Sequence, residues 1–126
     1  MEQTKPGTIR RLAAGLGIGA VCALIAAGVL TCLFAGVLAL GAPDGLITIF
    51  AYMISAFAAF AGGFFAGRKM REGGLKVGLL AGAVTFLLHL LCMLCFGSVS
   101  PVCLTFLPVE LLCGVVGGIL AVNLRR

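Results

Sequence analysis

The chain has 126 residues, of which 62% are hydrophobic and 10% are charged, and its formal net charge is +5. A soluble domain is nearer to about 45–50% apolar and about 25% charged. A water-soluble fold of this length could not bury so much apolar surface, so the composition excludes a separate soluble enzyme domain and indicates one domain in lipid. The basic residues form no face with interleaved aromatics, which excludes nucleic acid as a partner.

Four apolar runs are long enough to cross a membrane. They cover approximately residues 12–40, 46–67, 75–96 and 102–124. Backbone groups in hydrocarbon must be satisfied within their own segment, which predicts helices and not strands. The first run exceeds the roughly 20 residues that a bilayer core requires, so we expect it to tilt or to project. The expected fold class is therefore an all-α transmembrane four-helix bundle.

All nine Lys and Arg residues lie on one side of this four-span map. They precede the first run, lie between the second and the third or at the start of the third, or follow the fourth, at Lys5, Arg10, Arg11, Arg68, Lys69, Arg71, Lys76, Arg125 and Arg126. The connections 41–45 and 97–101 contain none. Basic residues are retained on the cytoplasmic face, which predicts that both termini are cytoplasmic. We expect the inner loop 68–74 to contact anionic headgroups.

Small residues recur at intervals of four in each run. The glycines that we predict to pack helix against helix are Gly15, Gly19, Gly63, Gly67, Gly74, Gly78, Gly82, Gly114 and Gly118. Such small-xxx-small ridges let helix backbones approach closely where lipid removes the usual hydrophobic driving force. Whether their partners lie within the chain or in a second copy is left open by the pattern.

A weak internal repeat relates the two halves of the chain. Segment 15–21 matches 78–84 at both glycines and at the following Ala-Val, and the Gly-Gly pair at 62–63 matches that at 117–118. The chain could be a tandem duplication of a helical hairpin. Glycine-rich helices also produce such matches by chance.

Three side chains inside the apolar runs could carry chemistry, namely Tyr52, His89 and Glu110, and they lie on the same helix faces as the small residues. At about 1.5 Å per residue, all lie within about 10 Å of the outer interface. One hypothesis is a shared site in which Glu110 pairs with His89 and binds a proton, a cation or a substrate amine. The sequence favours the alternative, in which a helix begins at Pro108 and Glu110 sits at its wet N-terminus without a partner.

The six cysteines suggest two further hypotheses. The pair Cys92-x-x-Cys95 would suit a membrane thiol–disulfide oxidoreductase, but such enzymes need a second exposed pair, and the turn 41–45 has no cysteine. The other hypothesis is a structural disulfide between Cys95 and Cys103. A buried cysteine otherwise behaves as a small hydrophobe. His89 is the sole histidine, so we expect no metal site and no cofactor.

Glycine patterns recur in the second half of the chain. They are Ala61-Gly-Gly-Phe-Phe-Ala-Gly-Arg68, the segment Glu72–Gly78 with Gly82, and the closing Gly117–Leu124. Together they resemble the YrzE-like small membrane proteins of spore-forming and related low-GC Gram-positive bacteria. The resemblance implies a four-span protein of the bacterial cytoplasmic membrane and carries over no catalytic residue, because these proteins have no assigned activity.

The function that we expect is structural or accessory, through helix packing and self-association or contact with another membrane protein, with no enzymatic activity. The alternative is a small transporter or a proton- or cation-coupled protein that uses Glu110, His89 and Tyr52. The small multidrug transporters have a similar length and span number, but they rely on an acid in the first span, where this chain has none. A thiol–disulfide oxidoreductase is a distant third hypothesis.

Overall fold

The computed structural model describes residues 6–43, 45–70, 73–95, 97 and 100–124, and within them the chain forms four helices. They are α1 (Pro6–Ala39), α2 (Gly45–Met70), α3 (Gly74–Cys95) and α4 (Cys103–Asn123). Each is long and apolar enough to cross a membrane, and the described residues include no strand. The predicted all-α architecture with four candidate membrane spans is therefore confirmed.

The helix limits follow the predicted runs closely except at two ends. α1 begins at Pro6, before the apolar run, because proline is compatible with the first position of a helix and the polar arm continues the helix from there. Its 34 residues correspond to roughly 50 Å, which exceeds a hydrocarbon core of about 30 Å. α2 continues past Gly67 to Met70, with Arg68 and Lys69 in its last turn, where cations favour the helix dipole.

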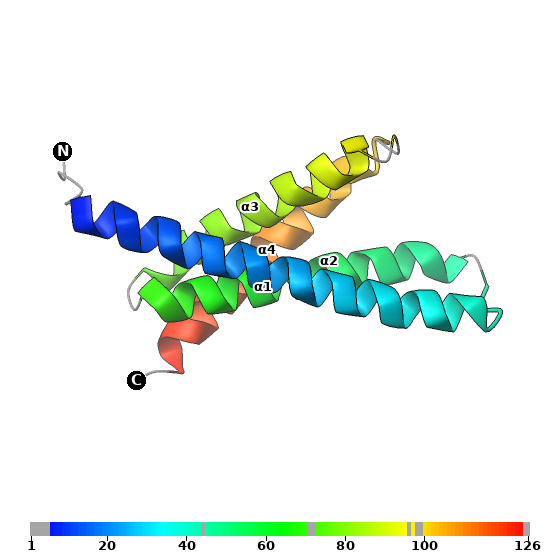
Figure 1. Cartoon of the computed structure of the whole chain (residues 1–126), viewed down its shortest axis with the longest axis horizontal. Helices are drawn as coiled ribbons and strands as arrows, with labels where there is room; N and C mark the ends of the chain where they lie inside the picture. Colours follow the sequence, from blue (N-terminus) through cyan, green and yellow to red (C-terminus); the bar gives the residue numbers. More distant parts are fainter. Residues whose placement is uncertain (1–5, 44, 71–72, 96, 98–99, 125–126) are drawn as a thin grey trace.

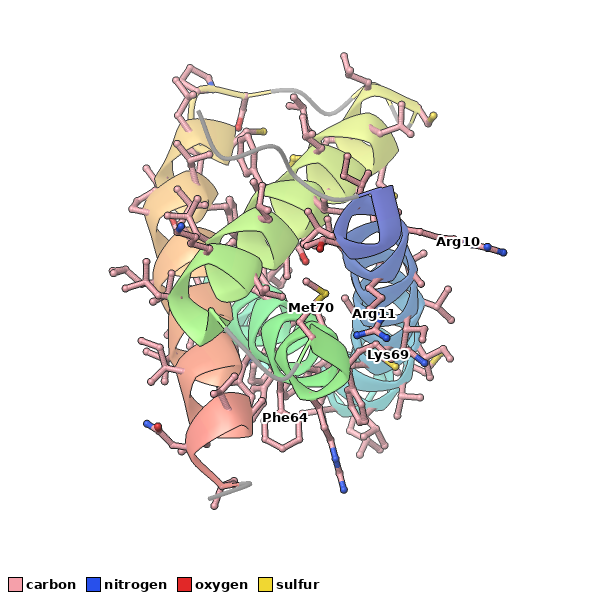
Figure 2. All side chains as sticks on the ribbon, turned by 90° about the vertical axis from the view of Figure 1, so that its left-hand side faces the viewer. Arg10, Arg11, Phe64, Lys69 and Met70 are labelled. Atoms are coloured by element: carbon pink, nitrogen blue, oxygen red, sulfur yellow. The ribbon has the colours of Figure 1, made fainter. Side chains whose placement is uncertain are left out.

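The helices form two antiparallel hairpins that cross near the middle of the bundle and diverge toward their turns (Figure 1). The start of α1, the end of α2, the start of α3 and the end of α4 lie together at the opposite end (Figure 1). α2 contacts all three other helices, whereas α1 contacts α2 and, less extensively, α3. Seen along the bundle, α1 and α4 therefore lie on opposite sides of α2 (Figure 2).

Basic side chains gather at the end where α1 begins. Arg11 on α1 lies close to Lys69 at the end of α2, and Arg10 points outward from the bundle at the same end (Figure 2). Other residues used in the sequence predictions lie outside the described part of the chain: Lys5, Asp44, Arg71, Glu72, Phe96, Ser98, Val99, Arg125 and Arg126. The described basic residues thus agree with a map in which one end of the bundle is charged.

Contacts between helices are made largely by backbone against backbone at glycines. All the glycines predicted to pack are buried, and each faces atoms of another helix of the same chain. An added Cβ at Gly82 would lie 2.7 Å from the carbonyl oxygen of Glu110, and one at Gly19 would lie 2.6 Å from that of Gly62. The predicted partners therefore lie within the chain. Gly117 joins them with a close approach to the carbonyl oxygen of Phe60, and Gly62 joins them less tightly, since an added Cβ would lie 3.3 Å from Cβ of Ala23.

The interior is built from small side chains and the exterior from large ones. The buried core includes Ala58, Ala59, Ala66 and Ala81, whereas leucines, isoleucines and valines dominate the exposed surface. In water such an apolar exterior would favour aggregation, but in a bilayer the lipid tails solvate it. Close approach of α2, α3 and α4 follows from this distribution. Among the described residues, the buried polar side chains are Ser55, Thr85 and Glu110.

Candidate functional site

Glu110 lies inside helix α4 and not at its N-terminus. α4 begins at Cys103 and contains Pro108, so the hypothesis of a helix that begins at Pro108 is wrong. The physical reason is a series of i→i+3 backbone bonds, from Cys103 to Ser100 and from Thr105 to Val102, which starts the helix before the proline. Glu110 consequently lies about two turns inside the helix, and its exposed fraction is 0%.

The carboxylate of Glu110 joins three helices through one of its oxygens. Oε1 lies 2.8 Å from Nδ1 of His89 on α3, and it also accepts a hydrogen bond from the hydroxyl of Ser55 on α2. Oε2 is buried and has no hydrogen-bond partner among the described residues. Buried carboxylate oxygens normally have partners, so the unpaired Oε2 is the unusual atom of this site.

Tyr52 lies next to this centre without bonding to Glu110. Its hydroxyl shares a hydrogen bond with Thr105, and its ring stacks on Phe106 with 4.4 Å between the centroids. The same Phe106 ring lies 4.9 Å from the ring of His89. Of the three polar residues singled out in the sequence, the structure therefore brings two into direct contact and separates the third from them by one ring.

Sequence reasoning missed Ser55 as a polar partner. A serine at a small-residue position of a membrane helix is commonly a packing residue, and Ser55 continues the ridge that ends at Gly63 and Gly67. The signal that could have identified it is its spacing from Tyr52: residues three apart share a helix face, so Ser55 points toward the same interior as that tyrosine.

A cavity of about 300 Å³ is lined by Glu110 of α4 and by residues of α1, α2 and α3. Its walls are mainly apolar, from Ala23, Leu24, Ala27, Ile54, Ala58 and Leu88. Three hydroxyl side chains also line it, but each donates to an acceptor within the protein: Thr31 to Ala27 O, Thr85 to Ala81 O, and Ser55 to Glu110. The cavity thus combines apolar walls with one carboxylate.

The cysteines, all of which lie in the described part of the chain, are free thiols. The hypothetical Cys95–Cys103 disulfide is not formed, because Cys103 is buried and directs its Sγ toward Met93 Sδ at 2.9 Å, while Cys95 is exposed. Cys92 is exposed as well and lines the cavity. Among the described residues, no group of three or more His, Cys, Asp or Glu side chains is arranged to hold a metal ion.

Comparison with known proteins gives a family and no activity. A family model described as "Protein of unknown function (DUF3792)" matches residues 13–121. No curated protein and no solved structure matches the chain. The matched segment contains all of α2 and α3 and most of α1 and α4, including Ser55, His89 and Glu110. The chain therefore belongs to the DUF3792 family of proteins of unknown function.

Proposed function

We propose that the protein is a small multi-pass transporter of the bacterial cytoplasmic membrane that binds a proton or a cation at Glu110. The observation that carries the proposal is the complete burial of Glu110 beside a cavity, with Oε1 paired to His89 and Oε2 unpaired. A buried acid inside a membrane span is energetically unfavourable, and such residues commonly mark ion pathways and proton relays.

The two carboxylate oxygens of Glu110 differ in their hydrogen bonds, and this difference suggests how the site works. Ser55 and His89 hold Oε1 from two different helices, which restricts rotation of the carboxylate. Oε2 remains the acceptor that exchanges a proton or a cation with the cavity. His89 is partly exposed, with a side-chain exposure of 27%, so its imidazole connects the buried carboxylate with the surroundings of the bundle. No catalytic residue and no cofactor belong to this proposal.

The orientation that we propose has both termini in the cytoplasm. All nine basic residues fall on one side of the four-span map, and Arg10, Arg11 and Lys69 gather at the corresponding end of the bundle (Figure 2). That end would contact anionic headgroups. The resemblance to YrzE-like proteins supports a bacterial cytoplasmic membrane, and the repeated segments 15–21 and 78–84 support a tandem origin of the two hairpins.

A second candidate is an accessory role through contact with a second copy or with another membrane protein, and the exposure of α1 favours it. Glycines of α1 at positions 17, 28 and 36 are exposed, and an added Cβ at any of them would meet nothing within 4 Å. They leave room for a close helix approach from outside the chain. This candidate predicts that Glu110→Gln alters assembly at most.

Reconstitution in liposomes tests the proposal. Proton and cation flux are recorded with an internal pH dye and a cation-sensitive dye under imposed pH and potential gradients. We compare the wild type with Glu110→Gln, and Cys32→Ser on the exposed face of α1 is the matched control. The proposal predicts flux in the wild type and the control and its loss in Glu110→Gln. Absence of flux from well-folded wild type would overturn the proposal and leave the accessory role.

A further inference from the structure

We propose that the cavity beside Glu110 binds a small alkylammonium ion, whose N–H donates to Oε2 and whose carbon chain fills the apolar walls. This inference rests on the proposed function, because it names the class of substrate for the same site. Four features of the cavity support it: its unused hydrogen-bonding capacity, its charge, its walls and the position of its mouth.

The unused hydrogen-bonding capacity of the cavity is that of an acceptor. The hydroxyls of Thr31, Ser55 and Thr85 already donate within the protein. Oε2 of Glu110 is the buried polar side-chain atom without a partner in the described part of the chain. An occupant that completes the site must therefore bring a donor, and an N–H or O–H group satisfies this condition.

The charge of the cavity favours a single cation. Its lining contains one carboxylate and no lysine or arginine, and His89 is the other ionisable group that touches Glu110. Nδ1 of His89 contacts Oε1, so Oε2 is the carboxylate oxygen that no described cationic side chain contacts. A monocation in the cavity neutralises the charge of the carboxylate, and a charge-assisted hydrogen bond to Oε2 is stronger than a neutral one.

The walls select an occupant with a carbon chain over an inorganic ion. Side chains such as Ala23, Ala27 and Ile54 offer no ligand atoms for a metal cation, whereas they solvate methylene groups well. The volume of about 300 Å³ is at the lower limit of ordinary small-molecule pockets, which span about 300–1,000 Å³. The occupant is therefore small.

The mouth of the cavity opens on the side of the bundle, which would face hydrocarbon in a bilayer. The lining residues that are exposed include Leu24 and Thr31 on α1 and Cys92 on α3, so the opening lies between these two helices. Leu24 is 50% exposed and lies near the middle of α1, the helix Pro6–Ala39. An amine with an alkyl chain partitions into the bilayer and reaches this opening sideways, which a hydrated inorganic cation does not.

Calorimetric titration of the wild type in lipid nanodiscs tests the inference, with protein-free discs subtracted. The probes are n-hexylamine, 1-hexanol, which has a donor but no charge, and hexyltrimethylammonium, which has the charge but no N–H. Two variants change the site: Glu110→Gln removes the charge, and Ala27→Leu fills the cavity. Gly28→Ala is the neighbouring control, because its added Cβ meets nothing within 4 Å.

We expect saturable binding of hexylamine to the wild type and to Gly28→Ala, and affinity lower by at least about tenfold in both site variants and for both other probes. Glu110-dependent proton flux without saturable hexylamine binding would overturn this inference and preserve the proposed function. Equal binding of hexylamine and 1-hexanol would also overturn it, because the charge would then be irrelevant. Absence of both flux and binding would overturn the two proposals together.

Discussion

Nδ1 of His89 lies 2.8 Å from Oε1 of Glu110, although the residues are 21 positions apart and belong to different helices. Removal of either partner leaves a polar group of the other without its bond inside the bundle. We expect a double-mutant cycle of Glu110→Gln and His89→Gln to give a coupling energy of about 0.6–1.7 kcal/mol, as for polar pairs in other membrane bundles. Reversible unfolding in mixed micelles measures it. Additive single effects would contradict a direct interaction.

The pairing of Glu110 with His89 was accessible from the sequence as one of two alternatives, and the reason is helical geometry. His89 follows Gly82 by almost two turns, and Glu110 precedes Gly114 by about one, so each polar residue shares a face with a packing glycine. Pro108 left the two alternatives undecided, because proline is compatible both with the start of a helix and with its early turns. The choice depended on turn bonds around Ser100, which hydropathy does not report.

The helices themselves were predictable because lipid imposes a minimum length and complete internal hydrogen bonding on each span. The cavity was not predictable. It depends on how the two hairpins cross and diverge, and this is set by which glycine meets which carbonyl, such as Gly19 against Gly62 (Figure 1). Neither periodicity nor spacing gives the pairing of particular glycines between helices, so Ser55 and the unpaired Oε2 emerge only in three dimensions.

The contact of Gly82 with the backbone of Glu110 makes this glycine sensitive to a single added methyl group. A Cβ there would lie 2.7 Å from the carbonyl oxygen of Glu110 and 3.0 Å from Cα of Leu111. We expect Gly82→Ala to lower the free energy of unfolding by about 1–3 kcal/mol through overpacking. Gly28→Ala is the matched control, with open space around it, and should raise stability by up to about 1 kcal/mol through helix propensity. Equal stability of the two variants would contradict the close contact.

The variant Tyr52→Phe tests whether Tyr52 belongs to the proposed proton or cation site at Glu110. Its hydroxyl bonds to Thr105, whereas its ring stacks on Phe106 and would be retained in Tyr52→Phe. We expect this variant to lose about 0.5–1.5 kcal/mol of stability and to retain the Glu110-dependent flux. Thermal unfolding in detergent and the liposome assay provide the two measurements. Loss of flux as complete as in Glu110→Gln would place Tyr52 within the transport site.

The free thiols lead to a prediction about redox behaviour. Cys92 and Cys95 lie one turn apart on α3 and are both exposed, while Cys103 is buried against Met93. We expect mass spectrometry of protein purified without reductant to find unpaired thiols at all three positions. Thermal stability in detergent should be the same before and after treatment with dithiothreitol. A disulfide that forms and disappears reversibly in air and reductant would revive the oxidoreductase hypothesis.

The charged end of the bundle predicts the orientation of the protein in the membrane. Arg10, Arg11 and Lys69 lie at the end of the bundle where α1 begins and α4 ends, and the turn between α1 and α2 lies at the opposite end (Figures 1 and 2). Because basic flanks remain in the cytoplasm, green fluorescent protein fused after Arg126 should fluoresce. Alkaline phosphatase fused after Gly41 in a truncated chain should be active, since this enzyme folds only outside the cytoplasm. As a control, the two reporters are exchanged, and both should then be inactive. The reverse pattern would place the basic end outside the cytoplasm. A mixture of both patterns would indicate dual orientation. The one-sided distribution of basic residues disfavours dual orientation.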